Sequence, residues 1–362
     1  MLKKKKWDPN HWACIVMDLQ QTQLVPKLNA SSAYYKRKLC LYNFCVFDLQ
    51  NDKAYMYVWT ENVAKRGSVE IYSCLNKWIN DHLYTRDPYP RNLKIFADNC
   101  GGQNKNNNMC LALLMNIHQD KFDRIELGFL VPGHSYNTCD RMFSNIARKY
   151  NKCSQIYSPD QYIDLINAAL KSNKTSNAYL MKREDFLNIE IFVNRTNTAE
   201  RLCYIRPTEG KVFQKATQIV MNKWYPQGYI LKHNFNQSDS QGIKIPVNLP
   251  DTEEQEFDLS WIKLESKYIH ERKIAPMKMK DLLSLKTFMG HEGQWIDTLN
   301  QRWKKLTSQS HEDEELENAS PGSQNTSPEQ EEESEVYNNM DKIYERVSVS
   351  VSGKKSKKKV KN

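Results

Sequence analysis

The sequence lacks a Cys-x-x-Cys pair, a long apolar run, and an apolar segment behind its N-terminal lysines. The nine cysteines are scattered along the chain, which is typical of a reducing compartment and not of a disulfide-rich secreted scaffold. Without an apolar core behind them, the four lysines of Met1–Trp12 do not make a secretion signal. No stretch approaches the length of a membrane span. We therefore expect neither secretion nor insertion into a membrane.

Lysine and arginine are absent from one stretch, His311–Glu335, which carries ten acidic side chains. The formal net charge of the whole chain is +9, so removing these ten negative charges leaves +19 on the remainder. A basic body of this kind attracts polyanions, nucleic acid first. The alternative is a solvated, lysine-rich surface without a specific partner.

Size and composition indicate a folded core with accessory segments. The chain has 362 residues, 40% of them hydrophobic and 11% aromatic, which is ordinary for an α/β protein. We predict a basic N-terminal segment at 1–11 and a core domain at 12–175. A small α+β accessory region follows at 176–306, and a disordered tail, acidic and then lysine-rich, at 307–362.

The hydrophobic pattern of the core predicts strands and helices in a definite order. The expected strands are 12–18, the hairpin 39–49 and 54–60, then 93–97 and 125–131. The expected helices are 68–83, 109–118, 138–150 and 161–171. Beyond these, short strands are expected at 189–193 and 202–207, a β-rich unit at 211–232, and a helical pair within 279–306.

Three acids occupy special places in this order. Asp18 ends the first strand, Asp98 ends the fourth, and Asp140 lies in the first turn of the helix after the fifth. Three strands, then helix, strand, helix, strand and helix, with acids at these points, is the ribonuclease H-like arrangement. We therefore predict a ribonuclease H-like α/β fold, with a mixed five-stranded sheet flanked by helices.

This placement predicts a divalent-metal site, whether or not it is still active. Phosphodiester cleavage by the two-metal route needs carboxylates around two cations, and carboxylate oxygens are the ligands that Mg²⁺ and Mn²⁺ prefer. Asp18, Asp98 and Asp140 are the candidate catalytic residues and the ligands of two Mg²⁺ or Mn²⁺ ions. The alternative for each acid is a residue that only caps backbone N–H groups.

The loop after Asp98 reads Asn-Cys-Gly-Gly-Gln-Asn-Lys-Asn and precedes a helix. Its glycines permit close backbone approach, and Gln103, Asn104 and Lys105 offer donors near a helix N-terminus, where a phosphate binds well. His134, in a later loop, is a further candidate for contact with phosphate or water. The alternatives are an Asn/Gly turn that caps the helix and a surface histidine.

Zinc is the rival metal, because His134, Cys139 and Cys153 share one stretch and Cys100 could lie nearby. Their spacing fits no compact zinc finger. Buried structural cysteines explain the pattern better.

Several of these strings resemble a family of transposon-derived animal proteins of unknown function. They are Asp18-Leu19-Gln20-Gln21, Tyr34-Tyr35-Lys36-Arg37-Lys38, the loop Asp98–Asn106, Gly133-His134-Ser135 and Asp140-Arg141-Met142-Phe143. The resemblance runs over roughly Trp12 to Trp303 and implies an integrase-like (DDE transposase-type) core with mobile-element ancestry. Relatives usually carry a long region before the first strand, so we expect no separate DNA-binding module and little sequence-specific recognition. Many transposases have Glu as the third acid, where this chain has Asp140.

Two functions remain open at this point. One is a transposase- or integrase-like, metal-dependent enzyme of DNA phosphoryl transfer, which includes a truncated or domesticated remnant of one. The other is a catalytically inactive, transposon-derived protein that binds nucleic acid or protein. The expected partner is DNA with low sequence specificity, and self-association into a homo-oligomer stays open. The lysine run Lys354–Lys361 suggests a nuclear location, with a plain solubilising tail as the alternative.

Overall fold

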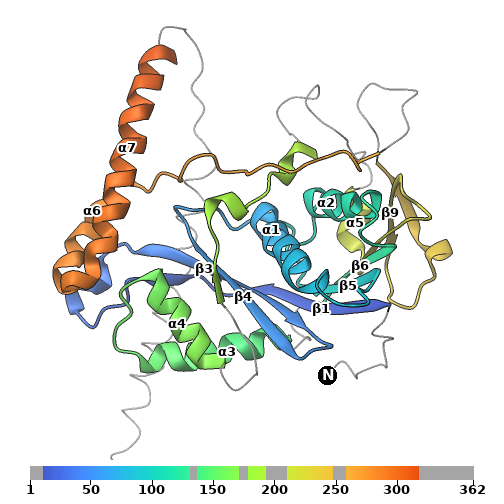
Figure 1. Cartoon of the computed structure of the whole chain (residues 1–362), viewed down its shortest axis with the longest axis horizontal. Helices are drawn as coiled ribbons and strands as arrows, with labels where there is room; N and C mark the ends of the chain where they lie inside the picture. The colour runs from blue at the N-terminus through green and yellow to red at the C-terminus, as the bar shows by residue number, and fades with distance from the viewer. Residues whose placement is uncertain (1–10, 131–136, 171–177, 193–209, 248–257, 318–362) are drawn as a thin grey trace, which may run out of the picture. The chain divides into compact units, whose positions relative to one another are not determined.

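A mixed β-sheet with helices on both faces forms the centre of the computed structural model (Figure 1), which describes residues 11–130, 137–170, 178–192, 210–247 and 258–317. The α/β class expected from the sequence is confirmed. The sheet has ten strands among these residues, more than the five of the prediction. No helix of the described part is long and apolar enough to cross a membrane.

The strands are β1 (Trp12–Leu19), β2 (Gln23–Val25), β3 (Leu39–Asp48), β4 (Lys53–Thr60), β5 (Asn92–Ala97), β6 (Arg124–Phe129), β7 (Ala178–Leu180), β8 (Gln218–Asn222), β9 (Gly228–Lys232) and β10 (Ile243–Pro246). Their order across the sheet is β10-β9-β8-β6-β5-β1-β3-β4-β7, and β2 pairs with β3 beside this path. The pairs β1–β5, β5–β6 and β4–β7 are parallel, and the others are antiparallel.

The helices are α1 (Ser68–Trp78), α2 (Asn107–His118), α3 (Thr138–Lys152), α4 (Pro159–Leu170), α5 (Gly210–Lys215), α6 (Pro276–Leu285) and α7 (Gln294–Glu317). Helices α1 and α2 pack on one face of the sheet, and α3 and α4 pack on the other (Figure 1). A π-helical turn, Ile79–Leu83, continues α1 to the end of the predicted helix. All ten residues of β3 are buried, because this inner strand is covered from both sides.

The region predicted as accessory continues the same sheet. Strand β7 adds to β4 at one edge, whereas β8, β9 and β10 extend the sheet antiparallel from β6 at the other. The backbone of β6 would otherwise present unpaired groups at an open edge, and β8 satisfies them. The division predicted at residue 175 is therefore not a division of the sheet.

One further predicted segment differs from the structure. Residues Ile189–Phe192 form a short 3₁₀ helix and not a strand, since Ile189 and Phe192, three residues apart, are both fully buried on one side of it. The expected strand at 202–207 lies outside the described residues.

The helical pair near the C-terminus is present, with α6 and the first part of α7 built around a small apolar cluster. Helix α7 continues to Glu317, ten residues into the segment predicted to be disordered. The physical reason is local, because Ser308–Glu317 contains good helix formers and the first breakers are Pro321-Gly322. The remaining tail, 318–362, lies outside the described residues.

Candidate functional site: three acids at one end of the sheet

The register of β1 and β5 places two of the predicted acids side by side. Val16 pairs with Phe96 in this parallel ladder, so Asp18 and Asp98, each two residues further on, reach the same level. Side chains alternate along a strand, and Cys14, Val16 and Phe96 belong to the face that α3 covers. Asp18 and Asp98 therefore lie on the α3 side of the sheet.

The third acid comes from α3 itself. Asp140 is the third residue of this helix and is exposed. Its Oδ2 atom accepts a hydrogen bond from the backbone N–H of Asn137 at 3.3 Å. The side-chain amide of the same Asn137 donates to Oδ2 of Asp18 at 3.2 Å. One residue thus links two of the three predicted acids.

Asn137 was not among the site residues expected from the sequence. It is the N-cap of α3, where its Oδ1 atom accepts from the N–H of Cys139 at 2.9 Å. A signal for this role exists in the sequence, since Asn followed three residues later by an acid is a capping box. What the pattern does not indicate is that the amide of this cap also reaches Asp18 on β1.

The electrostatics of Asp18 reflect this neighbourhood. Its pKa is raised to about 7, first by burial and then by the negative charges of Asp98 and Asp140. Hydrogen bonds from Leu19 N–H, at 2.8 Å, and from Asn137 lower the pKa but do not offset these causes. The three acids therefore share one electrostatic environment. Among the described residues, no group of three or more His, Cys, Asp or Glu side chains is placed to hold a metal ion, and the metal site stays a prediction.

The predicted phosphate-binding loop orients Asp98. The side-chain amide of Asn104 donates to Oδ1 of Asp98, and the N–H of Cys100 donates to the same oxygen at 3.3 Å. Asn104 is buried, and its own Oδ1 atom has no hydrogen-bond partner among the described residues. Asn106 caps α2 by accepting from the N–H of Met109 at 2.9 Å. Asn104 is therefore a positioning residue for Asp98.

Lys105 points into the protein. Its Nζ atom donates to the carbonyl oxygens of Gln214 at 2.7 Å and Ala216 at 2.6 Å, and lies 4.7 Å from the centre of the Phe129 ring. Burial lowers its pKa, and only 8% of the residue is exposed. This position does not fit the predicted phosphate contact. Lys105 instead ties the loop to the C-terminal end of α5 and to Ala216, which follows that helix.

Two candidate residues for phosphate contact remain, Gln103 and His134. Gln103 is half-buried, and its carbonyl oxygen accepts from the side chain of Asn106 at 3.2 Å. Its contact with phosphate stays a prediction. His134 lies outside the described residues.

The three cysteines considered as zinc ligands lie within the described residues, whereas His134 does not. Cys139 is fully buried, and its thiol donates to the carbonyl oxygens of Val16 at 3.4 Å and Cys45 at 3.8 Å. Cys100 and Cys153 are half-buried free cysteines. The contacts of Cys139 are those of a packed core thiol.

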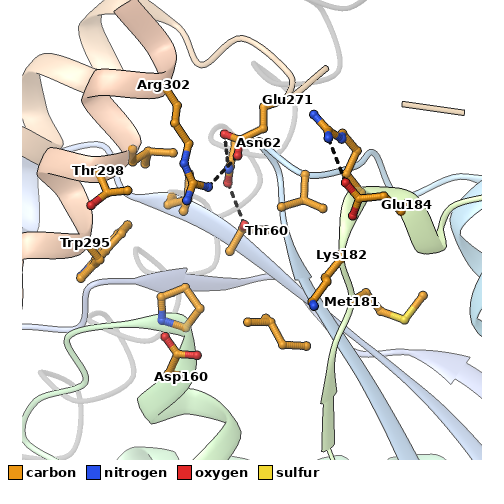
Figure 2. Close-up of a pocket in the computed structure, with 16 residues that line it drawn as sticks. Thr60, Asn62, Asp160, Met181, Lys182, Glu184, Glu271, Trp295, Thr298 and Arg302 are labelled. Carbon is orange, nitrogen blue, oxygen red and sulfur yellow. Dashed lines mark hydrogen bonds and ion pairs between the residues drawn. The ribbon is translucent and has the colours of Figure 1, made fainter. Parts of the chain in front are cut away.

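A pocket of about 800 Å³ lies away from the three acids, between the β7 edge of the sheet and α7 (Figure 2). Its polar side includes the ion pair between Arg302 and Glu271, 2.8 Å apart, and Glu271 also accepts from Asn62 at 3.4 Å. Trp295 and Met181 contribute apolar surface. These residues come from distant parts of the chain, so no local sequence pattern could indicate the pocket.

The fold and these residues define an α/β protein with an acidic site at the ends of two inner strands, β1 and β5, of a mixed sheet. Residues 44–216 match the model of a family described as a domain of unknown function, DUF7869. The match includes Asp98 and Asp140 and begins after Asp18. No curated protein and no solved structure matches the chain.

Proposed function

We propose that this chain has a ribonuclease H-like core derived from a mobile element, and that Asp18, Asp98 and Asp140 form the metal site of a transposase- or integrase-like phosphoryl-transfer enzyme. The core consists of the five inner strands, in the order β4-β3-β1-β5-β6. Strand β1 lies in the middle, with the antiparallel hairpin β3–β4 on one side and the parallel strands β5 and β6 on the other. Strands β7 to β10 are additions at the two edges.

One observation carries the proposal. The chain brings an acid from the end of β1, an acid from the end of β5 and an acid from the start of α3 to the same side of the sheet, and Asn137 contacts two of them. Capping alone explains Asp140, which bonds to its own N-cap. Asp18 and Asp98 also accept backbone N–H groups, from Leu19 and Cys100, but they lie at the ends of β1 and β5 and cap no helix.

The donor set fits a hard divalent cation. Three carboxylates supply oxygen ligands of the kind that Mg²⁺ and Mn²⁺ prefer, and when bound, two such ions activate the attacking oxygen and stabilise the leaving oxygen. The pKa of Asp18 is raised first by burial and then by the negative charges of Asp98 and Asp140, and a bound cation would offset that repulsion. Asn104 holds Asp98, and Asn137 contacts both Asp18 and Asp140, so fixed hydrogen-bond partners set the positions of all three carboxylates.

The test is metal-dependent stabilisation. Mn²⁺ should raise the melting temperature of the protein by mass action. Asp98→Asn keeps the shape of the side chain, so this variant should fold, lose most of the Mn²⁺ shift, and lose metal-dependent nicking of DNA. Asp160→Asn, an exposed acid at the start of α4, is the matched control and should change neither. Equal Mn²⁺ shifts for the parent and Asp98→Asn would contradict the metal site.

The proposed substrate is DNA, bound with little sequence preference and through its phosphates. The basic body of the chain supports this, and affinity should then fall steeply as salt increases. Tight, sequence-selective binding that is insensitive to salt would contradict it. We further propose a nuclear location through Lys354–Lys361, tested by fusing this segment to a cytoplasmic reporter. An unchanged distribution of the reporter would remove that proposal.

A second candidate function is a catalytically inactive protein that binds nucleic acid or protein. The hydrogen bond from the Asn137 side chain favours it, because this bond engages one of the two carboxylate oxygens of Asp18. The pocket beside α7 gives such a protein a further surface for binding. Absence of a Mn²⁺ shift together with salt-sensitive binding of DNA would select this function.

A further inference from the structure

The α3 side of the sheet is only half covered by helices. Helices α3 and α4 pack over β1, β3, β4 and β7, while the strands beyond β5 have no α-helix on this side in the described part of the chain. The side chains there are largely polar and charged: Lys94, Arg124, Glu126, Gln218, Asn222 and Lys232. This half belongs to the same face as Asp18 and Asp98.

A single segment, His233–Gln241, covers part of this half between β9 and β10. Phe235 packs on Phe96, with ring centroids 6.4 Å apart. It also lies directly over Gly128, where an added Cβ atom would stand 2.9 Å from its ring. Gly128 therefore provides the room that lets the segment lie flat on the sheet.

The second anchor of the segment is Asp239. Arg124 binds its carboxylate with both terminal nitrogens, at 2.5 and 2.8 Å, and Lys232 adds a contact of 2.7 Å. The side-chain amide of Asn222 donates to the same carboxylate at 3.3 Å. Three donors from β6, β8 and β9 thus converge on one anionic group.

These donors belong to the sheet, whereas Asp239 belongs to an exposed connecting segment that Phe235 and Asp239 hold in place. The side chains of Lys232 and Arg124 are 6% and 15% exposed. In contrast, most residues from His233 to Gln241 are exposed, including Phe235 at 44%. Exposed connecting segments open at lower cost than the strands below them.

We propose that Arg124, Lys232 and Asn222 form a binding site for a phosphate group of a nucleic-acid backbone, which the carboxylate of Asp239 occupies until nucleic acid displaces His233–Gln241. A bidentate arginine recognises phosphate and carboxylate by the same geometry. This site rests on the proposed function, because it extends the path of the nucleic acid away from the three acids. Arg124 pairs across the sheet at the level of Asn92, six residues before Asp98, which is roughly 20 Å along the strands.

The test compares DNA affinities of variants in EDTA, where the metal site plays no part. The probe is a fluorescein-labelled duplex oligonucleotide followed by fluorescence anisotropy. Since an internal competitor reduces apparent affinity by the fraction of open molecules, Asp239→Asn should bind the duplex about tenfold more tightly or better. Adding Arg124→Gln to this variant should remove the gain. Asp160→Asn changes the net charge equally and should leave the affinity close to that of the parent.

A second variant guards against misfolding of the first. Phe235→Ser releases the apolar anchor without changing charge, and it should also tighten binding. If both variants bind like the parent, or if the gain of Asp239→Asn survives the loss of Arg124, the site is refuted. An Mn²⁺ shift that depends on Asp98, with no gain from either variant, would overturn this inference and leave the proposed function standing. Tighter DNA binding by both variants in EDTA, without any Mn²⁺ shift in melting temperature, would support this phosphate site and contradict the proposed metal site.

Discussion

Replacing Asp18 with Asn removes the carboxyl group at the centre of the acidic site, and the consequence should be a change in how stability depends on pH. The pKa of Asp18 is raised from 3.8 to about 7 by burial, by Asp98 and by Asp140. Between these two values the native state keeps a proton that the unfolded state has lost. The free energy of unfolding of the parent therefore falls as the pH rises through this window.

The size of the effect follows from the shift. Each pH unit in the window costs close to 1.4 kcal/mol, so the whole interval costs on the order of 4 kcal/mol. Below the window both states of the parent are protonated and the penalty is absent. Above it both are ionised and the penalty is complete. The amide that Asp18→Asn introduces does not titrate, so the variant should lack this decline.

The assay is urea denaturation in EDTA, followed by circular dichroism between about pH 4 and pH 8. The amide of the variant has one acceptor oxygen in place of two, so it keeps the hydrogen bond from the Leu19 N–H or from the Asn137 side chain but not both, which shifts its stability by a similar amount at every pH. The informative quantity is therefore the difference between the two proteins, which should grow in favour of the variant as the pH rises. Two parallel curves would refute the reasoning, because Asp18 would then not be strained by its neighbours.

Other predictions concern contacts that fix the site and the fold. Lys278→Met should cost about 3 to 5 kcal/mol of unfolding free energy, because it leaves Glu61, its partner at 2.8 Å, buried and unpaired, and adding Glu61→Gln should recover much of the loss in urea denaturation. Lys105→Met should cost roughly 1 to 3 kcal/mol by leaving two carbonyl groups without their donor, yet DNA affinity measured by anisotropy should hardly change; a large loss of affinity would restore its phosphate role. Asn104→Ala should weaken the Mn²⁺ shift in melting temperature by freeing Asp98, and an undiminished shift would show that this contact is not needed.

Local sequence patterns suffice to predict the order of the strands and helices and to place the three acids at the ends of these elements. Alternating and helical apolar patterns act locally, so the boundaries of β1, β3, β4 and β5 could be predicted closely. Asp18 and Asp98 stand at the ends of two buried strands, and this position predicts that their side chains meet at one end of the sheet. The polarity of Asn137-Thr138-Cys139-Asp140 likewise marked the start of α3.

Which strands are neighbours, and which groups the side chains near the acids contact, depends on tertiary packing and could not be predicted from the sequence. Strand β8 pairs with β6, about ninety residues earlier, through backbone groups that carry no sequence signal of their partner. Lys105 points inward because the end of α5 and the residue after it place two carbonyl groups beside its Nζ atom. The sequence of the loop alone could not reveal these partners. The convergence of Arg124, Lys232 and Asn222 on Asp239 also depends on the packing of segments distant in the chain, since hydrogen bonds and charges act on proximity in space and not on order in sequence.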